Sequence, residues 1–171
     1  NVSLNDAKRE ILPSPYFDYQ HLDLDSVSLS AHDIIYDQHL IRASVDEFQA
    51  TECYSGLEVN QLATKFEMED DLIRVNDLDL RLGNDASLAG QLSMDLNVLD
   101  SLHTGFADAD LKLCIDSANL YRLVAPYVPT LTKYWEGRKV DLALQGRVTN
   151  DSLDLRHLDV NIDQHLELKA E

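Results

Sequence analysis

The residues of this sequence with the clearest capacity for chemistry are aspartates that recur at alternate positions. They form the pairs Asp23 and Asp25, Asp77 and Asp79, and Asp108 and Asp110. Residues two apart in a β-strand share a face and lie about 7 Å apart, which would suit a glycosidase pair or a calcium site. The sequence contains neither an EF-hand loop nor the calcium-binding nonapeptide of β-solenoids. Because an acidic protein fills the water-facing positions of its strands with Asp, we interpret these pairs as surface residues.

Histidine, serine and glycine lack the spacing that catalysis or metal binding needs. The 6 histidines show no HExxH, His-x-His or Cys-His ligand spacing. His21 and His157 fall on outward or corner positions, where we expect solvated imidazoles. Ser87 and Ser117 have no nucleophile-elbow context, and the glycines are scattered singly, so no phosphate-binding loop exists. We predict a protein that is not an enzyme, with no metal and no cofactor.

The charge balance excludes two classes of partner. Lys and Arg number 14 and Asp and Glu number 31, which gives a formal net charge of −17. Such a field repels nucleic-acid phosphates and anionic lipid headgroups. We therefore predict no nucleic-acid partner and no electrostatic docking on an anionic membrane.

The ends and cysteines of the chain indicate how it is organised. Cys53 and Cys114 form no CxxC pair, and the alternation around them favours unpaired strand residues. The chain starts at Asn1, without a signal-like stretch and without an apolar run near the ~18 residues of a membrane span. We expect a fragment of a larger protein, in which residues 1–16 are a lead-in segment with a helical turn near its middle and residues 17–171 are a single β-repeat domain.

The elements that must position the polar residues are short antiparallel strands. Apolar side chains recur at every second position over residues 43–45, 88–96, 111–113 and 140–144, which is the period of a half-buried strand. Turn residues interrupt this alternation at Asp70-Asp71, Gly83-Asn84-Asp85 and Asn150-Asp151. The sequence therefore predicts a mainly β fold of antiparallel repeated hairpins that form a curved, U-shaped (taco-like) sheet or a sandwich.

A finer pattern repeats inside the alternation: apolar, polar, apolar, two outward residues, apolar, polar, apolar. Copies begin at residues 22, 43, 57, 73 and 153. A strict period of two would turn the second half of each strand to the opposite face, so we predict a bulge or bend at each doubled polar step. The copies predict one shared inward surface that includes Leu22, Leu24, Val27, Leu29, Ile73, Val75, Leu78, Leu80, Leu153, Leu155, Leu158 and Val160. If a second sheet or a helix covers this surface it is a core, and if it stays open it is an apolar groove suited to acyl chains.

One region departs from the strand pattern. Apolar side chains recur at helical spacing at Leu120, Leu123, Val124 and Tyr127. Asp116 or Ser117 can cap the start of a helix, and Pro126 disfavours its continuation. We predict a short helical insert around residues 117–135, with a second helical turn before Gly137. This insert is either a plug over an apolar end of the sheet or a lid or lipid-facing element.

The repeated phrase resembles the AsmA-like/TamB family of bacterial envelope proteins. The residues that carry the resemblance are the strand, Gly, strand, turn, strand, corner phrase of residues 142–160, the similar run at 86–96 and the insert at 123–129. The resemblance implies a non-catalytic internal segment of a protein that is anchored in the inner membrane and spans the periplasm. It also implies an apolar groove for phospholipid acyl chains, a role in phospholipid transport or outer-membrane protein assembly, and a barrel assembly protein as the partner of the parent chain.

A second class of function remains open beside this one. Tyr121, Tyr127, Tyr134 and Trp135 would suit a sugar platform in a carbohydrate-binding or adhesive β-domain of a surface protein. Exposed edge strands would in either case invite pairing between copies of the chain.

Overall fold

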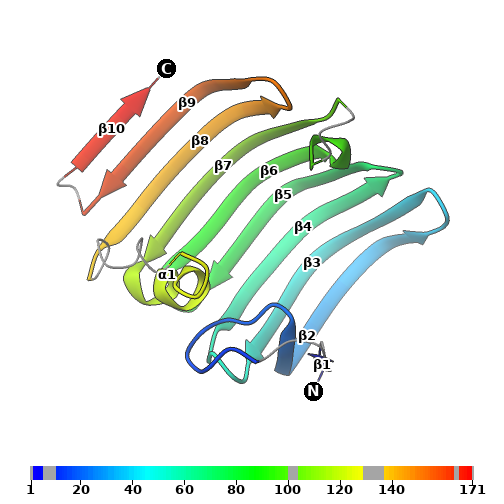
Figure 1. Cartoon of the computed structure of the whole chain (residues 1–171). Helices are drawn as coiled ribbons and strands as arrows, with labels where there is room; N and C mark the ends of the chain where they lie inside the picture. Colours follow the sequence, from blue (N-terminus) through cyan, green and yellow to red (C-terminus); the bar gives the residue numbers. More distant parts are fainter. Residues whose placement is uncertain (1, 6–10, 100–103, 129–136, 164–165, 171) are drawn as a thin grey trace.

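The computed structural model describes residues 2–5, 11–99, 104–128, 137–163 and 166–170. Within them, one antiparallel sheet contains ten strands whose spatial order is their order in the chain (Figure 1). The strands are β1 (Val2–Asn5), β2 (His21–Tyr36), β3 (Leu40–Glu52), β4 (Glu58–Glu69), β5 (Leu72–Leu82), β6 (Ala86–Asp95), β7 (Phe106–Asp116), β8 (Lys139–Thr149), β9 (Leu153–Ile162) and β10 (Leu166–Ala170). A 3-10 helix, η1 (Leu96–Leu99), follows β6, and one α-helix, α1 (Ser117–Val124), follows β7.

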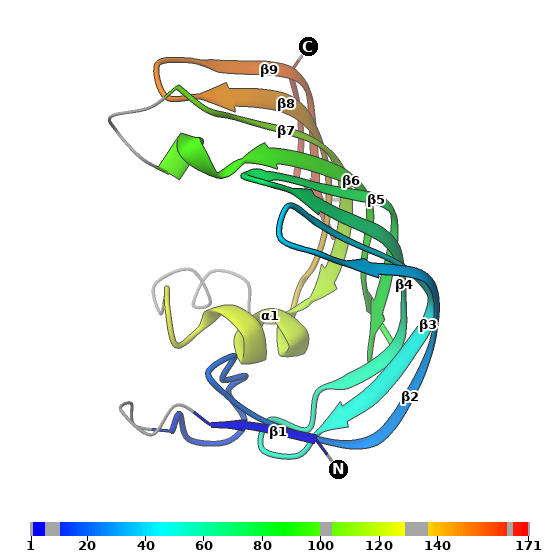
Figure 2. The ribbon, with the colours of Figure 1, turned by 90° about the vertical axis from the view of Figure 1, so that its right-hand side faces the viewer.

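The sheet is strongly curved along its strands. Figure 2 shows β2 to β9 bending around a concave side, with α1 lying inside the curve at one end. The strands are joined at all three predicted turn positions, residues 70–71, 83–85 and 150–151, and the last connection extends to residue 152. The predicted mainly β fold of antiparallel hairpins is therefore confirmed, as a single curved sheet rather than a sandwich.

The predicted bulges lie at the doubled polar steps. The register shifts by one residue between Asp25 and Ser28 in β2 and between Val45 and Phe48 in β3. Further shifts fall at Val59 to Leu62 in β4, at Val75 to Leu78 in β5 and at Leu155 to His157 in β9. Ser26 and Asp77, each the second residue of its step, have positive φ angles of 54° and 53°. The extra residue lets each strand bend while both of its halves keep their apolar side chains on one face.

The strands β6, β7 and β8 show directly that the face is preserved. β6 alternates without a bulge, yet its Met94 pairs with Ile73 before the β5 bulge and its Leu88 pairs with Leu80 after it. Because residues at even spacing on an unbroken strand share a face, both halves of β5 face the same way. The same reasoning applies to β9. Its neighbour β8 alternates without a bulge, and residues on both sides of the β9 bulge pair with the apolar face of β8.

The N-terminal part of the chain differs from the expectation. Val2–Asn5 forms strand β1, which pairs antiparallel with residues 21–24 of β2 and was not predicted as a strand. The predicted helical turn within the lead-in and the predicted second helical turn before Gly137 lie outside the described residues. The division of the chain at residue 16 stays a prediction.

The molecule exposes much more surface than a closed domain of its mass. Its accessible surface is 11147 Å² at 19.3 kDa, whereas a compact monomer of this mass exposes about 8,500 Å². A single sheet with only one end of one face covered accounts for the difference. The described residues include no helix that is long and apolar enough to cross a membrane.

Candidate functional site: the apolar concave face

Apolar side chains form continuous rows across the sheet on the side that α1 covers. Because residues paired directly across strands share a face, the register defines each row. The longest row consists of Leu29, Phe48, Leu62, Leu80, Leu88, Leu113, Leu142, Val160 and Leu168. We call the surface made of this row and its parallel neighbours the apolar face, and Figure 2 shows that it is the concave side of the sheet.

The register brings most of the predicted inward residues together. Leu29, Leu80 and Val160 belong to the longest row. Three further rows connect β5 to β9 and join Ile73 with Leu153, Val75 with Leu155, and Leu78 with Leu158. Leu22 and Leu24 pair with Leu4 and Val2 of β1, and Val27 lies within the bulge of β2.

Residues of the intervening strands complete these rows and were not among the predicted set. They are Leu88 and Leu92 of β6, Leu111 and Leu113 of β7, and Leu142 and Leu144 of β8. The signal that identifies them is the strict alternation of residues 88–96, 111–113 and 140–144. The doubled polar step marks only the bent strands, so it does not select their straight neighbours.

Burial changes from one end of the apolar face to the other. None of the twelve predicted residues is buried: nine are half-buried, and Val27, Leu29 and Leu153 are exposed. Leu29 keeps 62% and Leu153 70% of its surface exposed. The buried apolar side chains lie at the end that α1 covers, where Ala86, Ile115 and Val140 form a cluster. The sequence left two possibilities for this surface, an open groove or a packed core. The larger part of the apolar face is open, and only the end that α1 covers is packed as a core.

Helix α1 covers that end, and its start is fixed by an N-cap. Asp116 accepts hydrogen bonds from the backbone N–H groups of Ala118 at 2.8 Å and Asn119 at 3.0 Å, which is an N-cap. Although burial opposes its ionisation, these hydrogen bonds lower the pKa of Asp116 below its ordinary value. Leu120 and Leu123 then pack on the buried cluster. The predicted plug over an apolar sheet end is confirmed for α1.

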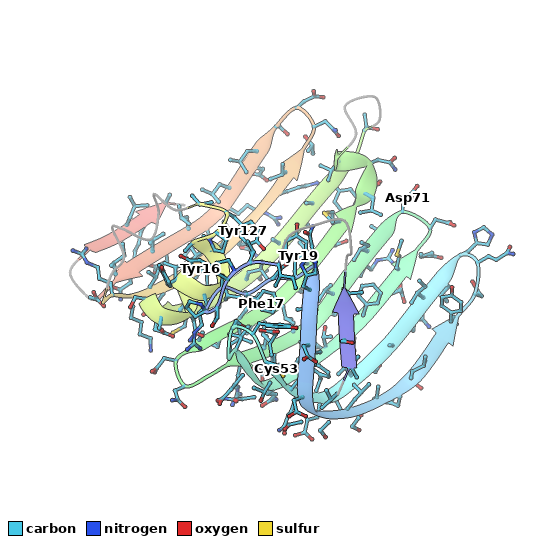
Figure 3. All side chains as sticks on the ribbon, turned by 60° about the horizontal axis from the view of Figure 1, so that its bottom comes forward. Tyr16, Phe17, Tyr19, Cys53, Asp71 and Tyr127 are labelled. Carbon is cyan, nitrogen blue, oxygen red and sulfur yellow. The ribbon has the colours of Figure 1, made fainter. Side chains whose placement is uncertain are left out.

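Residues 11–20 complete the cover, and we call these residues together with α1 the cap. The backbone N–H of Phe17 donates to the carbonyl of Arg122 at 2.9 Å. Two pairs of tyrosine rings connect residues 11–20 to α1 and the residues that follow it. Tyr16 packs on Tyr121 and Tyr19 on Tyr127, with ring centroids 5.3 Å and 5.9 Å apart. Figure 3 shows Tyr16, Phe17, Tyr19 and Tyr127 gathered at this end of the sheet.

The cap is tied to β2 by a buried aspartate and histidine. Asp18 and His21 keep only 5% and 3% of their surface exposed, and His21 Nδ1 lies 2.9 Å from the Asp18 carboxylate. Asp18 also accepts hydrogen bonds from the backbone N–H groups of Leu12 and Gln20. The expectation of a solvated His21 is therefore wrong, because the lead-in segment folds back over the start of β2.

Glu52 is a second buried carboxylate at the same end, and its hydrogen bonds stabilise the fold. It keeps 2% of its surface exposed. Its carboxylate accepts hydrogen bonds from the backbone N–H and the hydroxyl of Ser55, both at 2.6 Å, and from the backbone N–H of Tyr54 at 3.2 Å. These hydrogen bonds close the turn between β3 and β4. They satisfy the buried carboxylate of Glu52, which we therefore interpret as a structural residue.

The paired aspartates lie on the opposite, polar face, where several are ion-paired. Lys65 Nζ lies 2.6 Å from Asp77, and Arg81 lies 3.1 Å from Asp79. Asp108 binds two arginines, Arg147 at 3.0 Å and the nearby Arg156. Exposed pairs of this kind contribute about 0–1 kcal/mol each.

Neither cysteine has a disulfide partner, and their positions differ. Cys114 lies in β7 as expected, whereas Cys53 lies in the turn after β3 and is exposed. Local desolvation and the neighbouring carboxylates of Asp23, Asp25 and Glu52 raise the pKa of Cys53 above its ordinary value, and burial raises that of Cys114. Both thiols are thereby kept in the less reactive protonated form. Within the part of the chain that the structure describes, no three His, Cys, Asp or Glu side chains gather in a way that could hold a metal ion.

Comparison with known proteins yields no relative for this chain: no family model, curated protein or solved structure matches it.

Proposed function

We propose that the apolar face binds the acyl chains of phospholipids, and that the chain is a non-catalytic segment of a periplasm-spanning envelope protein. The observation that carries the proposal is the set of apolar rows whose predicted residues all remain half-buried or exposed on a concave surface. Monomeric soluble proteins rarely expose large contiguous apolar patches unless these bind something apolar. The resemblance of the sequence to the AsmA-like/TamB family supports the same assignment.

The dimensions of the apolar face suit an acyl chain. Eight strands, β2 to β9, spaced by about 4.8 Å, give a surface about 34 Å wide. One acyl chain extends about 15 Å, which is half of the hydrocarbon thickness of a bilayer, so it would cross three to four strands. The cap covers the face at one end of the strands, and we propose that a bound chain lies across the strands on the part of the face that the cap leaves open.

Binding of this kind is driven by burial of apolar surface. Each methylene group that leaves water contributes about 0.8 kcal/mol. The net charge of −17 disfavours anionic headgroups, so a zwitterionic phospholipid is the better probe. A charged side chain placed beneath the acyl chain would lose its hydration and oppose binding.

The test uses phosphatidylcholine that carries a fluorophore on one acyl chain. Leu88, between Leu80 and Leu113 on the apolar face, is replaced by Asp. The matched control is Ala89→Asp on the next residue, which faces the polar side between Asp79 and Lys112. We expect the wild-type chain and A89D to bind the probe and L88D to bind at least about tenfold more weakly.

Two outcomes would contradict the proposal. The first is the absence of saturable binding to the folded wild-type chain, with no phospholipid retained in native mass spectrometry. The second is equal loss of binding in both variants, which would mean that the introduced charge acts on the whole molecule and not on the apolar face. Circular dichroism of each variant shows whether the sheet is intact.

We further propose that the segment acts through a parent chain that is anchored in the inner membrane, in phospholipid transport or outer-membrane protein assembly with a barrel partner. Phospholipid delivery and barrel assembly differ in cargo. Saturable binding in the acyl-chain assay would support phospholipid delivery, and cross-linking of the chain to unfolded barrel strands would support barrel assembly. Strands β1 and β10 are the edges of the sheet and would pair between copies, which sedimentation across a concentration series would detect.

A further inference from the structure

The polar face contains a hollow that the proposed function does not use. Its volume is about 280 Å³, and its lining includes Arg74, Asn76, Gln91, Asp110, Gln145 and Arg156. Its polar lining residues Arg74, Asn76, Asp110 and Gln145 lie on the opposite side of the sheet from the apolar rows, because they alternate with Val75, Leu111 and Leu144 along their strands. Leu92 and Ala109 also border the hollow. An acyl chain on the apolar face would therefore leave the hollow free.

Two bulges flank the hollow. Gln91, Asp110, Gln145 and His157 form one cross-strand row over β6 to β9. At one end of this row the β5 bulge sets both Asn76 and Asp77 opposite Gln91. At the other end the β9 bulge adds Arg156 beside His157. The straight strands between the bulges form the floor, and a second hollow of about 470 Å³ shares Gln91 and Asp110 with the first.

The charges around the hollow are largely paired within the sheet. Asp108 binds Arg147 and Arg156, and Arg147 is held further by the ring of Phe106, 4.3 Å from its guanidinium carbon. Arg74 lies 2.5 Å from Glu67. This pairing lowers the attraction of the hollow for an ion of either sign.

The neutral polar side chains of the hollow are the amides of Asn76, Gln91 and Gln145 and the hydroxyl of Ser93. Gln145 is half-buried, and its amide nitrogen donates to Asp110 at 3.4 Å. Gln91 and Asn76 lie at the same level of the sheet, toward β5. A primary amide offers two donors and a carbonyl acceptor, and planar amide, carboxylate and guanidinium groups can each bond two neighbouring hydroxyls.

We propose that this hollow binds a short stretch of uncharged glycan. Vicinal hydroxyls are both donors and acceptors, as are the amides of Asn76, Gln91 and Gln145 in the hollow, and they need no counter-charge. A polyanionic glycan would meet the field of a chain with net charge −17. The two hollows share Gln91 and Asp110, so together they offer neighbouring places for successive sugars of a linear chain.

The experiment records the side-chain amide resonances of the ¹⁵N-labelled chain during titration with cellohexaose, maltohexaose and chitohexaose. We expect one hexasaccharide to shift the side-chain amides of Gln91 and Gln145 at sub-millimolar to millimolar concentration. Gln145→Ala and Gln91→Ala should each weaken binding of that sugar about tenfold. The matched control, Gln49→Ala, changes an exposed glutamine of β3 outside the hollow and should leave the affinity unchanged.

Three results would overturn the inference: no shift of these amides with any hexasaccharide, binding that survives both Gln145→Ala and Gln91→Ala, or binding that Gln49→Ala weakens equally. Saturable binding of hexalysine but of no hexasaccharide would also overturn it, since it would mean that unpaired negative charge dominates the hollow. The phospholipid assay on the opposite face stays independent, so failure of either proposal leaves the other testable. Two glutamine variants are used so that misfolding of one does not decide the outcome.

Discussion

At the residue scale, the most constrained side chains are polar ones beneath the cap. Asp18 is almost fully buried, yet it accepts hydrogen bonds from Leu12, Gln20 and His21. Burial favours the neutral acid, but the three hydrogen bonds together outweigh it, and the pKa of Asp18 lies below its ordinary value. The ionised carboxylate therefore stabilises the folded state and holds the lead-in segment against β2.

This shift predicts a pH dependence of stability. Because the folded-state pKa is depressed, the stabilisation is fully present above the unfolded-state pKa of about 4 and is lost as the pH falls through the lower folded-state value. Asp18→Asn should lower the free energy of unfolding at pH 7 by about 1–3 kcal/mol, since a buried charged acceptor is replaced by a neutral one. Urea unfolding at pH 7 and at pH 3 measures the difference, which should shrink at the lower pH.

The control for this prediction is Asp33→Asn. Asp33 is exposed in β2 with a φ of 53°, a conformation that Asn tolerates, so the substitution should change stability little at either pH. Equal stability of D18N and the wild-type chain at pH 7 would contradict the assigned role of Asp18.

At the element scale, the bulge is the device that gives the sheet its curvature. Asp77 occupies the β5 bulge with a φ of 53°, whereas Asp79, two residues on, pairs in the ordinary register with Ala89. Gly146 lies opposite the β9 bulge, where an added Cβ would come within 2.9 Å of the Asp154 carbonyl oxygen. The close approach of the bulged β9 backbone therefore explains why residue 146 is a glycine.

The left-handed backbone at the bulge should affect the stability of Asp77 variants independently of the ion pair that Asp77 makes. Asp77→Gly and Asp77→Val both remove the contact with Lys65, but only Val suffers in the left-handed conformation, at a cost of about 1–2 kcal/mol. We therefore expect D77V to be less stable than D77G by that amount. At Asp79 the order should be reversed, because Val suits an ordinary strand position better than Gly. Thermal unfolding of the four variants checks both orders, and D77V at least as stable as D77G would exclude strain at the bulge.

At the scale of the whole molecule, packing is distributed unevenly along the strands. The cap end contains the buried cluster of Ala86, Ile115 and Val140, whereas the other end of the same strands has exposed Val148 and Leu153. Local opening requires less free energy where few apolar contacts are lost. Stability should therefore fall along each strand with distance from the cap.

Amide hydrogen exchange measures this gradient. Although both ends of the strands are paired in the ladder, we expect amides near Ile115 and Val140 to exchange at least about tenfold more slowly than those near Ala107 and Val148. Leu120→Asp, which removes the helix contact, should reduce the difference by accelerating exchange at the cap end. Uniform protection along β7 and β8 would contradict the uneven packing.

Local sequence determined the turns, the strands other than β1, and the bends at the doubled polar steps. Alternation identifies which side chains of residues 88–96 and 140–144 share a face, and the doubled polar step locates a bulge because the period of two leaves no other way to keep one face apolar. The capped start of α1 can likewise be predicted, since Asp116 satisfies backbone donors within three residues of itself. These features depend on interactions between near neighbours in the chain, which the sequence records directly.

Only the tertiary structure decided what covers the apolar face and what the polar residues do. His21 looks solvent-exposed in the sequence because its burial depends on residues 11–20 folding back onto β2. The alternation of residues 2–5 is only four residues long, which is too short to identify β1 as a strand without its pairing to β2. The hollow on the polar face depends on two bulges, in β5 and β9, whose separation is set by the intervening strands. Whether the twelve predicted apolar residues line a core or an open surface depends on how far one short helix reaches across the sheet, which no local pattern encodes.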